Sequence, residues 1–316
     1  MTEELKINGK AAIKREESDA CIDSSECEQA RPVIRGKAIY TTKGAAMEYG
    51  RIGCNFYRGC PHGCEYCYLK RGAPSAQLGG NVAVLKKCFK DEEDAGNVFC
   101  KEIDKWLEPC KKYGIFLSFS TDPLIPETRS LTLKAIIEAV LRDIPVYILT
   151  KDATFVNDEC EFMAWMENVT LPYRDLIHFG FTLTGRDNME PNASPNMDRI
   201  KAMEQLHGMG FKTFASIEPV IDWMHASMVI HLTLGCCDHY KIGLRSGVKK
   251  DYYDEDLSRG SIRGLVDMIT HAGRTVYLKE STRKLLRRCF IEEECEHILS
   301  MTVDMDGKPY KRLPEC

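Results

Sequence analysis

The sequence predicts an α/β protein in which parallel strands alternate with helices in a complete or partial barrel. Three observations lead to this fold class. Apolar runs of strand length alternate with segments of helical period at intervals of roughly 30 residues. Neither a glycine-rich dinucleotide fingerprint nor a phosphate-binding loop follows any predicted strand. Polar residues gather where the predicted strands end, and parallel β/α folds place their functional groups there.

The elements follow one another without an evident linker. Residues 1–30 are polar, mixed in charge and without a period, which predicts a disordered or loosely held leader. Predicted strands cover residues 53–58, 115–121, 146–149, 177–184, 212–217, 240–244 and 275–278. Predicted helices cover residues 97–112, 128–142, 154–168, 194–209, 223–231, 257–271 and 282–290. We expect residues 31–280 to form the barrel and residues 281–316 a C-terminal helix and tail packed on it, with no element after residue 296.

Composition limits the class of protein. The chain has 316 residues, 44% hydrophobic and 28% charged, with a net charge of −4, which is ordinary for a globular protein and gives no global signature of nucleic-acid binding. No apolar run reaches the length of a membrane span, and the first residues lack a signal peptide's apolar core. The odd number of cysteines, 15, fits a reducing compartment better than a disulfide framework, so we expect a cytoplasmic protein.

Three cysteines, Cys60, Cys64 and Cys67, lie in one loop after the first predicted strand. Their spacing would line one stripe of a buried helix, but two glycines and a proline between residues 59 and 63 oppose a helix. A zinc site needs a fourth ligand, for which Cys54 and His62 are candidates, and the paired C-x2-C pattern of zinc ribbons is absent. Three thiolates without a paired fourth suit an iron–sulfur cluster that leaves one iron open.

The C-x3-C-x2-C spacing, with Tyr66 before its last cysteine, resembles the radical S-adenosylmethionine superfamily. The resemblance covers about residues 52–278. It implies a partial (β/α)6-type TIM barrel of parallel strands, with a [4Fe-4S] cluster and S-adenosyl-L-methionine as cofactors. It also implies reductive cleavage of S-adenosylmethionine to a 5′-deoxyadenosyl radical that abstracts hydrogen from a substrate.

Within this superfamily the chain resembles spore photoproduct lyase and related DNA-photolyase-like proteins. The residues that carry this resemblance are 57–68, 120–123, 150–151, 181–184, 194–195 with 199–200, and 217–220. Phe119 stands where the lyase has a cysteine hydrogen donor, and Glu218 stands where an alanine would be expected. Repair of the spore photoproduct itself is therefore not expected, and the substrate stays open.

The resemblance implies roles for individual residues. Cys60, Cys64 and Cys67 would ligate the cluster, and Tyr66 would contact the adenine. The other cofactor-binding candidates are Thr121 near the methionine group, Lys151 at its carboxylate, Thr182 near the ribose hydroxyls, Thr184 and Glu218. Tyr68, which matches a tyrosine on the lyase's hydrogen-transfer path, and Glu218 are the catalytic candidates.

Plainer interpretations stand beside these roles. Thr182 and Thr184 are also ordinary strand formers, and Lys151 at a strand end is also typical of a solvated charge. Asp122 is able simply to close a turn with Pro123, and Glu218 to cap or pair structurally.

Further cysteines and a basic run complete the candidates. Cys289, Cys295 and Cys316 are candidates for an auxiliary metal site or for buried thiols, and Cys236 and Cys237 for core residues or a hydrogen donor. The basic run comprises Lys279, Arg283, Lys284, Arg287 and Arg288, which fits a solvated helix face or a phosphate-binding surface.

The leading prediction is a radical S-adenosylmethionine enzyme, of lyase or oxidoreductase type, that abstracts hydrogen from an unknown substrate. A nucleic acid and a small molecule are the candidate substrates. It would take electrons from a reducing partner such as flavodoxin or ferredoxin, with no membrane partner. A non-catalytic zinc-binding interaction module and a radical enzyme that modifies RNA or a peptide are the alternatives.

Overall fold

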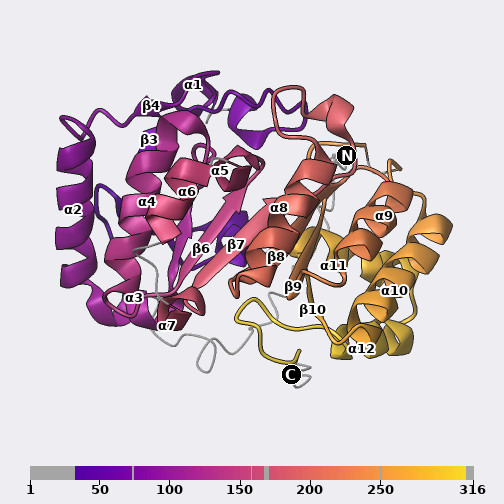
Figure 1. The fold of residues 1–316 in the computed structure, drawn as a ribbon. Coiled ribbons are helices and arrows are strands. Elements are labelled where there is room, and N and C mark those ends of the chain that lie inside the picture. The colour runs from indigo at the N-terminus through magenta and orange to yellow at the C-terminus, as the bar shows by residue number, and fades with distance from the viewer. Residues whose placement is uncertain (1–32, 73–74, 158, 167–170, 250, 311–316) are drawn as a thin grey trace, which may run out of the picture. The chain divides into compact units, whose positions relative to one another are not determined.

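The computed structural model describes residues 33–72, 75–157, 159–166, 171–249 and 251–310. All of them belong to one compact unit, Pro32–Arg312 (Figure 1). The predicted leader, residues 1–30, and Cys316 lie outside the described residues. Within the described part of the chain, no helix has the length and apolar character needed to cross a membrane.

The centre of the unit is an eight-stranded sheet in the order β1-β2-β5-β6-β7-β8-β9-β10. β1 runs antiparallel to β2, and every other pair of neighbours is parallel. The strands are β1 (Ile39–Thr41), β2 (Ile52–Cys54), β5 (Ile115–Leu117), β6 (Val146–Thr150), β7 (Ile177–Thr182), β8 (Lys212–Val220), β9 (His239–Leu244) and β10 (Thr275–Leu278). The predicted α/β fold with a parallel sheet is confirmed. A separate antiparallel pair consists of β3 (Tyr57–Arg58) and β4 (Val84–Leu85).

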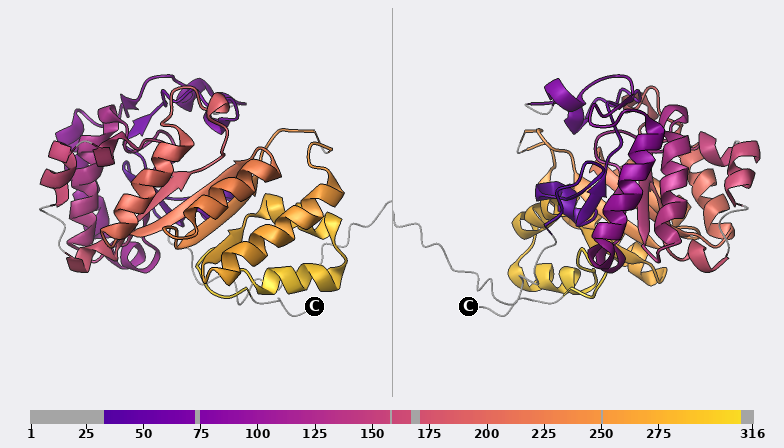
Figure 2. Two further views of the ribbon diagram at one scale, coloured as in Figure 1. Left: turned by 45° about the vertical axis from the view of Figure 1, so that its right-hand side comes forward. Right: turned by 90° about the vertical axis from the view of Figure 1, so that its left-hand side faces the viewer.

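Helices connect the parallel strands and cover one face of the sheet (Figure 2). The α-helices are α1 (Ser75–Leu78), α2 (Glu92–Lys105), α3 (Leu107–Tyr113), α4 (Pro126–Val140), α5 (Thr154–Asn157), α6 (Glu159–Met166), α7 (Leu171–Arg174), α8 (Asn196–Gly208), α9 (Trp223–Thr233), α10 (Glu255–His271), α11 (Glu280–Cys289) and α12 (Glu292–Ser300). Three 3-10 helices are η1 (Gly44–Glu48), η2 (Tyr68–Lys70) and η3 (Asp187–Met189). α4 packs on β6, α8 on β7 and β8, α9 on β8, and α10 on β10.

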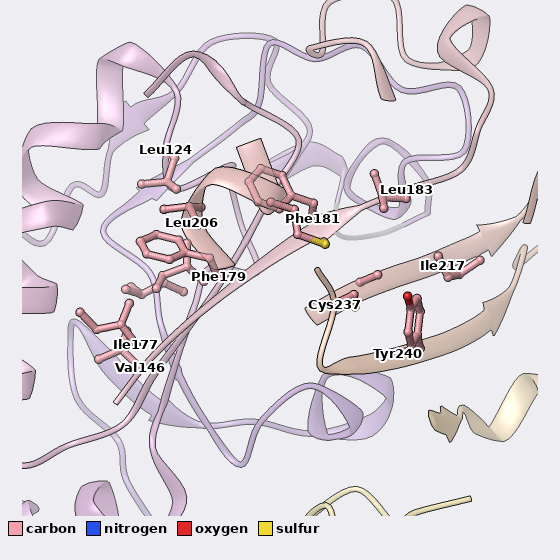
Figure 3. Close-up of a cluster of buried hydrophobic side chains, with 14 of the residues drawn as sticks. Leu124, Val146, Ile177, Phe179, Phe181, Leu183, Leu206, Ile217, Cys237 and Tyr240 are labelled. Carbon is pink, nitrogen blue, oxygen red and sulfur yellow. The ribbon is translucent and has the colours of Figure 1, made fainter. Parts of the chain in front are cut away.

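Alternate residues of the central strands form the hydrophobic core between sheet and helices (Figure 3). Ile177, Phe179 and Phe181 of β7 are fully buried. The ring of Phe179 meets those of Phe155 and Trp165 at centroid distances of 5.5 and 6.1 Å. Because side chains of a strand point alternately to its two faces, the intervening residues of β7 point to the inner face, away from the helices.

The inner face carries many polar side chains. Tyr147 stacks on His178 of the next strand, with centroids 4.4 Å apart. Burial is the main cause that lowers the pKa of His178 to about 4, so this imidazole is neutral near pH 7. Towards the carboxyl ends of the strands the same face presents Glu218 and Lys279, which form an ion pair at 2.6 Å.

Several predicted boundaries were wrong. The strand predicted over residues 53–58 is divided into β2 and β3, and the side chain of Asn55 between them binds the Phe119 amide and the Tyr40 hydroxyl. The helix predicted over residues 97–112 begins at Glu92 and breaks at Trp106. The helix predicted over residues 154–168 is two helices, α5 and α6, and part of it lies outside the described residues. The segment after residue 296 was predicted to have no element, but α12 continues to Ser300.

Candidate functional site

The cysteine loop lies between β3 and η2 and contains no helix from Cys60 to Cys67. Gly59 and Gly63 have φ angles of +82° and +72°, which glycine adopts readily. A Cβ on Gly59 would lie 2.3 Å from the carbonyl oxygen of Val82, so a larger residue does not fit there. The helical-stripe interpretation of the three cysteines is therefore wrong.

Hydrogen bonds attach the loop to the connection between β7 and α8. The amide and side chain of Asn192 donate to the carbonyls of His62 and Pro61, at 3.1 and 2.9 Å. The amide of Glu65 donates to the carbonyl of Met189 at 3.0 Å. The loop thus lies at the carboxyl ends of the parallel strands, as predicted. In Figure 1 it belongs to the purple segment at the upper edge of the sheet, near α1.

A buried pair joins the loop to the strand end after β5. His62 Nε2 lies 2.8 Å from an oxygen of Asp122, and both side chains are buried. The other ring nitrogen of His62 lies 3.1 Å from the carbonyl of Asn192. Burial alone would raise the pKa of Asp122, but His62 and backbone amides outweigh it and lower that pKa to about 2. Asp122 therefore anchors the loop rather than only closing a turn.

A second buried pair organises the other side of the loop. Arg199 lies 2.8 Å from Glu190, and neither side chain is exposed. The Tyr66 hydroxyl donates to Glu190, and the Thr184 hydroxyl lies 3.2 Å from the same carboxylate. Thr182 takes part through its backbone, because its carbonyl accepts from Arg199 at 2.7 Å. Two predicted residues, Tyr66 and Thr184, thus meet at Glu190. Glu190 itself was not predicted as a site residue, because no sequence pattern around it indicates an ion pair with Arg199.

Lys151 lies beside this arrangement, and Thr121 precedes Asp122, which accepts from the Lys151 amide. Lys151 Nζ lies 5.7 Å from the centroid of the Tyr66 ring. Burial lowers the pKa of Lys151, but the nearby Cys64 and Glu190 outweigh it and raise that pKa, so the ammonium stays charged. The buried hydroxyl of Thr121 has no hydrogen-bond partner among the residues that the structure describes. Since buried polar groups normally have a partner, this hydroxyl is suited to a bound ligand.

The two catalytic candidates lie apart from these pairs. Tyr68 is 57% exposed, and its hydroxyl donates to the backbone carbonyl of Phe119. The Phe119 ring stacks on Phe116 with centroids 4.5 Å apart. Glu218 accepts from Lys279 at 2.6 Å and from Tyr49, which the sequence did not indicate as a site residue.

The three thiols suit an iron–sulfur cluster by donor type. Burial raises the pKa of Cys60 to about 12, and the neighbouring Cys64 adds to this rise. Burial also raises the pKa of Cys64, to which Cys67 contributes. No group of three or more His, Cys, Asp or Glu side chains converges on a metal position within the described ranges. Thiolates are the usual cluster ligands, and a bound cluster would lower the pKa of each thiol that it takes.

The other zinc-ligand candidates are occupied elsewhere. Cys54 is fully buried on β2, and burial raises its pKa well above the ordinary value. Both ring nitrogens of His62 lie close to other groups, Asp122 and the carbonyl of Asn192. The arrangement therefore does not favour a single zinc ion held at this loop.

The four other cysteine candidates that the structure describes lie in the core. Cys289 and Cys295 are buried in α11 and α12, and Cys236 and Cys237 are buried before β9. The Cys237 thiol lies 3.2 Å from the carbonyl of His239. This fits the interpretation of these thiols as core residues.

The basic run is divided between different environments. Lys279 is buried on the inner face, and the Arg283 guanidinium lies 4.8 Å from the Tyr277 ring centroid. Lys284 and Arg287 pair with Glu280, and Arg288 pairs with Glu255. These contacts do not favour a phosphate-binding surface.

Comparison with known proteins gives a weak likeness. No protein-family model and no curated protein matches the chain. Three solved structures of SuiB from Streptococcus suis are similar. SuiB bound to S-adenosylmethionine gives a TM-score of 0.46 at 15% identity over 70% of this chain and 48% of SuiB. SuiB alone gives a TM-score of 0.45 at 14% identity over 70% of this chain and 46% of SuiB. SuiB bound to the precursor peptide SuiA gives a TM-score of 0.47 at 13% identity over 71% of this chain and 46% of SuiB. The chain thus spans less than half of SuiB, and TM-scores this low carry no conclusion about family or activity.

Proposed function

We propose that this chain is a radical S-adenosylmethionine enzyme. The observation that carries the proposal is the three-thiol loop at the carboxyl ends of parallel strands, beside the charged Lys151. The buried Thr121 hydroxyl, which has no partner among the described residues, also lies after a parallel strand, β5. Parallel β/α folds bind ligands at this end of the sheet. The loop supplies thiolate ligands, and the strand ends supply groups for a polar cofactor.

Cys60, Cys64 and Cys67 would hold a [4Fe-4S] cluster. When bound, such a cluster supplies the electron that cleaves S-adenosylmethionine to a 5′-deoxyadenosyl radical. The protein's own residues bind and orient the cofactor, and the buried pairs around the loop keep water away from it.

In this proposal the charged Lys151 ammonium binds the carboxylate of S-adenosylmethionine, and the Thr121 hydroxyl hydrogen-bonds to its methionine group. Glu190 fixes the hydroxyl of Tyr66, and the Tyr66 ring lies beside Lys151. We assign this ring to the contact with the adenine. Thr182 and Thr184 have partners within the protein, so we assign them to shaping the site through Arg199 and Glu190.

The reaction belongs to the photoproduct-lyase-like group in this proposal, with a different substrate. Phe119 lies at the position of the lyase's cysteine donor, and its ring packs on Phe116, so it offers no thiol hydrogen. A reducing partner such as flavodoxin or ferredoxin would supply the electron, and a cytoplasmic location stays a prediction.

Anaerobic reconstitution tests the proposal. With iron, sulfide, dithionite and S-adenosylmethionine, the wild-type protein should turn brown and release 5′-deoxyadenosine. The combined variant Cys60→Ala, Cys64→Ala and Cys67→Ala should lose both properties, because it lacks the thiolate ligands. Cys88→Ala, which removes an exposed thiol outside the loop, serves as the control and should keep both. Equal release of 5′-deoxyadenosine by the triple variant would overturn the proposal.

A further inference from the structure

Glu218 is an acidic residue on the inner face of the sheet, and part of its side chain is exposed. It lies near the carboxyl end of β8, and its side chain is 26% exposed. One carboxylate oxygen, Oε2, accepts from the Tyr49 hydroxyl and from Lys279 Nζ at 2.6 Å. The other oxygen, Oε1, receives no hydrogen bond from any residue that the structure describes, so it is available to a ligand.

A glycine in the intervening strand makes the Glu218–Lys279 pair possible. β9 lies between β8 and β10 in the sheet, and Gly243 of β9 separates the two side chains. A Cβ on Gly243 would lie 2.8 Å from Cδ of Glu218 and 2.9 Å from Cδ of Lys279. Real Cβ atoms do not come this close to other atoms, so a side chain at residue 243 would push Glu218 or Lys279 out of its present position.

Tyr49 holds the carboxylate from the other side. It follows η1 in the connection between β1 and β2, about 170 residues before Glu218 along the chain. Its hydroxyl lies 2.7 Å from the hydroxyl of Ser216, and its ring centroid lies 4.2 Å from Lys279 Nζ. Glu218 is therefore fixed by elements from both ends of the chain, which is the kind of support that a positioned binding group needs.

The charges around Glu218 favour a cationic ligand. Glu48 lies 3.6 Å from Lys279, so two carboxylates share this lysine. The second lysine of the network, Lys241, donates to the carbonyl of Glu48 at 2.8 Å. Burial, and then the charge of Lys279, lower the pKa of Lys241 to about 7, so it is only partly charged near neutral pH. Two carboxylates, Glu218 and Glu48, thus lie against the one buried ammonium of Lys279, and a carboxylate binds charged N–H donors most strongly.

We propose that Glu218, positioned by Tyr49 and Lys279 across Gly243, binds an amine or guanidinium group of the substrate. This inference rests on the proposed function in one respect, which is that the substrate binds at the inner face near the carboxyl ends of the strands. It assigns Glu218 to the substrate rather than to the cofactor ribose.

Binding of simple cations tests the proposal without any cofactor chemistry. The probes are n-butylamine hydrochloride, N-butylguanidinium chloride and, as the anion, sodium butyrate, observed by saturation-transfer NMR with the full chain. We expect both cations to bind the wild-type protein, Glu218→Gln to weaken this binding at least about tenfold, and butyrate to give no signal. The matched control Glu293→Gln alters an exposed carboxylate on α12 and should bind the cations as the wild type does.

Two further variants test the positioning. Tyr49→Phe keeps the ring but removes the hydroxyl that Glu218 accepts from, and Gly243→Ala places a methyl group between Glu218 and Lys279. Both should weaken cation binding, while Tyr49→Phe should leave the affinity for S-adenosylmethionine unchanged in calorimetry. Circular dichroism checks that each variant is folded, and Tyr49→Phe gives the answer if Gly243→Ala does not fold.

The proposal is overturned if Glu218→Gln keeps full cation binding, if butyrate binds as well as the amines, or if Glu218→Gln weakens only S-adenosylmethionine. The cation-binding assay needs neither a cluster nor a reductant, so its outcome is independent of whether the protein releases 5′-deoxyadenosine. The two proposals therefore fail separately.

Discussion

At the scale of single residues, a few buried charges determine where the cysteine loop lies. Asp122 accepts from the amides of Leu124 and Lys151 and from the Thr150 hydroxyl, at 3.0, 2.7 and 2.7 Å, and it pairs with His62. A buried carboxylate with so many donors binds its proton weakly in the folded state. The position of the loop thus depends on one side chain that was predicted only as a possible turn residue.

The lowered pKa of Asp122 predicts a stability change in acid. Its pKa is about 2 in the folded protein and 3.8 ordinarily, so the carboxylate contributes stability above pH 4 that is lost as the pH falls from about 4 to about 2. The contribution is about 2 kcal/mol. Urea unfolding at pH 6 and pH 3 measures this effect. Asp122→Asn should lower the free energy of unfolding at pH 6, and the free energies at pH 6 and pH 3 should differ less than in the wild type. The exposed control Asp256→Asn should behave as the wild type. An Asp122→Asn protein with the full wild-type pH response would contradict this account.

At the scale of elements, side chains of the helices hold the edge of the sheet. The Glu102 carboxylate of α2 accepts from the amides of Lys37, Ala38 and Ile39, at 2.5, 3.0 and 2.9 Å. It fixes the start of β1, and Gly36 packs so tightly here that a Cβ would meet the carboxylate at 2.3 Å. β1 has only three residues and one strand neighbour, so its place depends on this carboxylate.

Removing the Glu102 carboxylate should therefore loosen β1. Glu102→Ala leaves three backbone amides without their acceptor, and we expect a loss of about 2–4 kcal/mol in the free energy of unfolding. Chemical denaturation measures the loss, and far-UV circular dichroism should show that helix content is kept. Glu93→Ala, which changes an exposed carboxylate of the same helix, should cost less than about 1 kcal/mol. Equal losses in the two variants would show that the amide contacts contribute nothing specific.

The local sequence pattern predicted the helices and strands better than the side-chain contacts between them. β7 and α8 were predicted within about two residues of their bounds, because buried runs and a Pro–Gly start and stop are local signals. The start of α2 was missed although Asp91 caps it, because the apolar period begins only after its acidic first turn. The cysteine loop follows from spacing, but Glu190, Tyr49 and Gly243 act through residues far along the chain, which no local pattern reveals.

At the scale of the whole described unit, the connection between β1 and β2 joins the first strands to the last. Glu48 accepts from the Tyr277 hydroxyl at 3.0 Å and from the amide of Glu280 at 2.7 Å. α11 has no side-chain cap of its own at Lys279, so Glu48 supplies an acceptor at that helix N-terminus from more than 200 residues away. The negative charge also suits the positive end of the helix.

Loss of Glu48 should release the last strand and helix without disturbing the centre of the sheet. Glu48→Ala removes the acceptor for the Glu280 amide and the Tyr277 hydroxyl, so local opening near β10 and α11 becomes easier. Hydrogen–deuterium exchange followed by mass spectrometry should show at least about tenfold faster exchange in residues 275–289, because an opening free energy lower by about 1.4 kcal/mol is tenfold in rate. Peptides from β6 and β7 should exchange as in the wild type, and Lys43→Ala, an exposed change beside η1, should change neither region. Uniformly faster exchange would mean that Glu48 supports global stability instead, and unchanged exchange near α11 would mean that the connection does not hold the last elements. The predicted pattern would show that the connection between β1 and β2 holds the last strand and helix in place through Glu48.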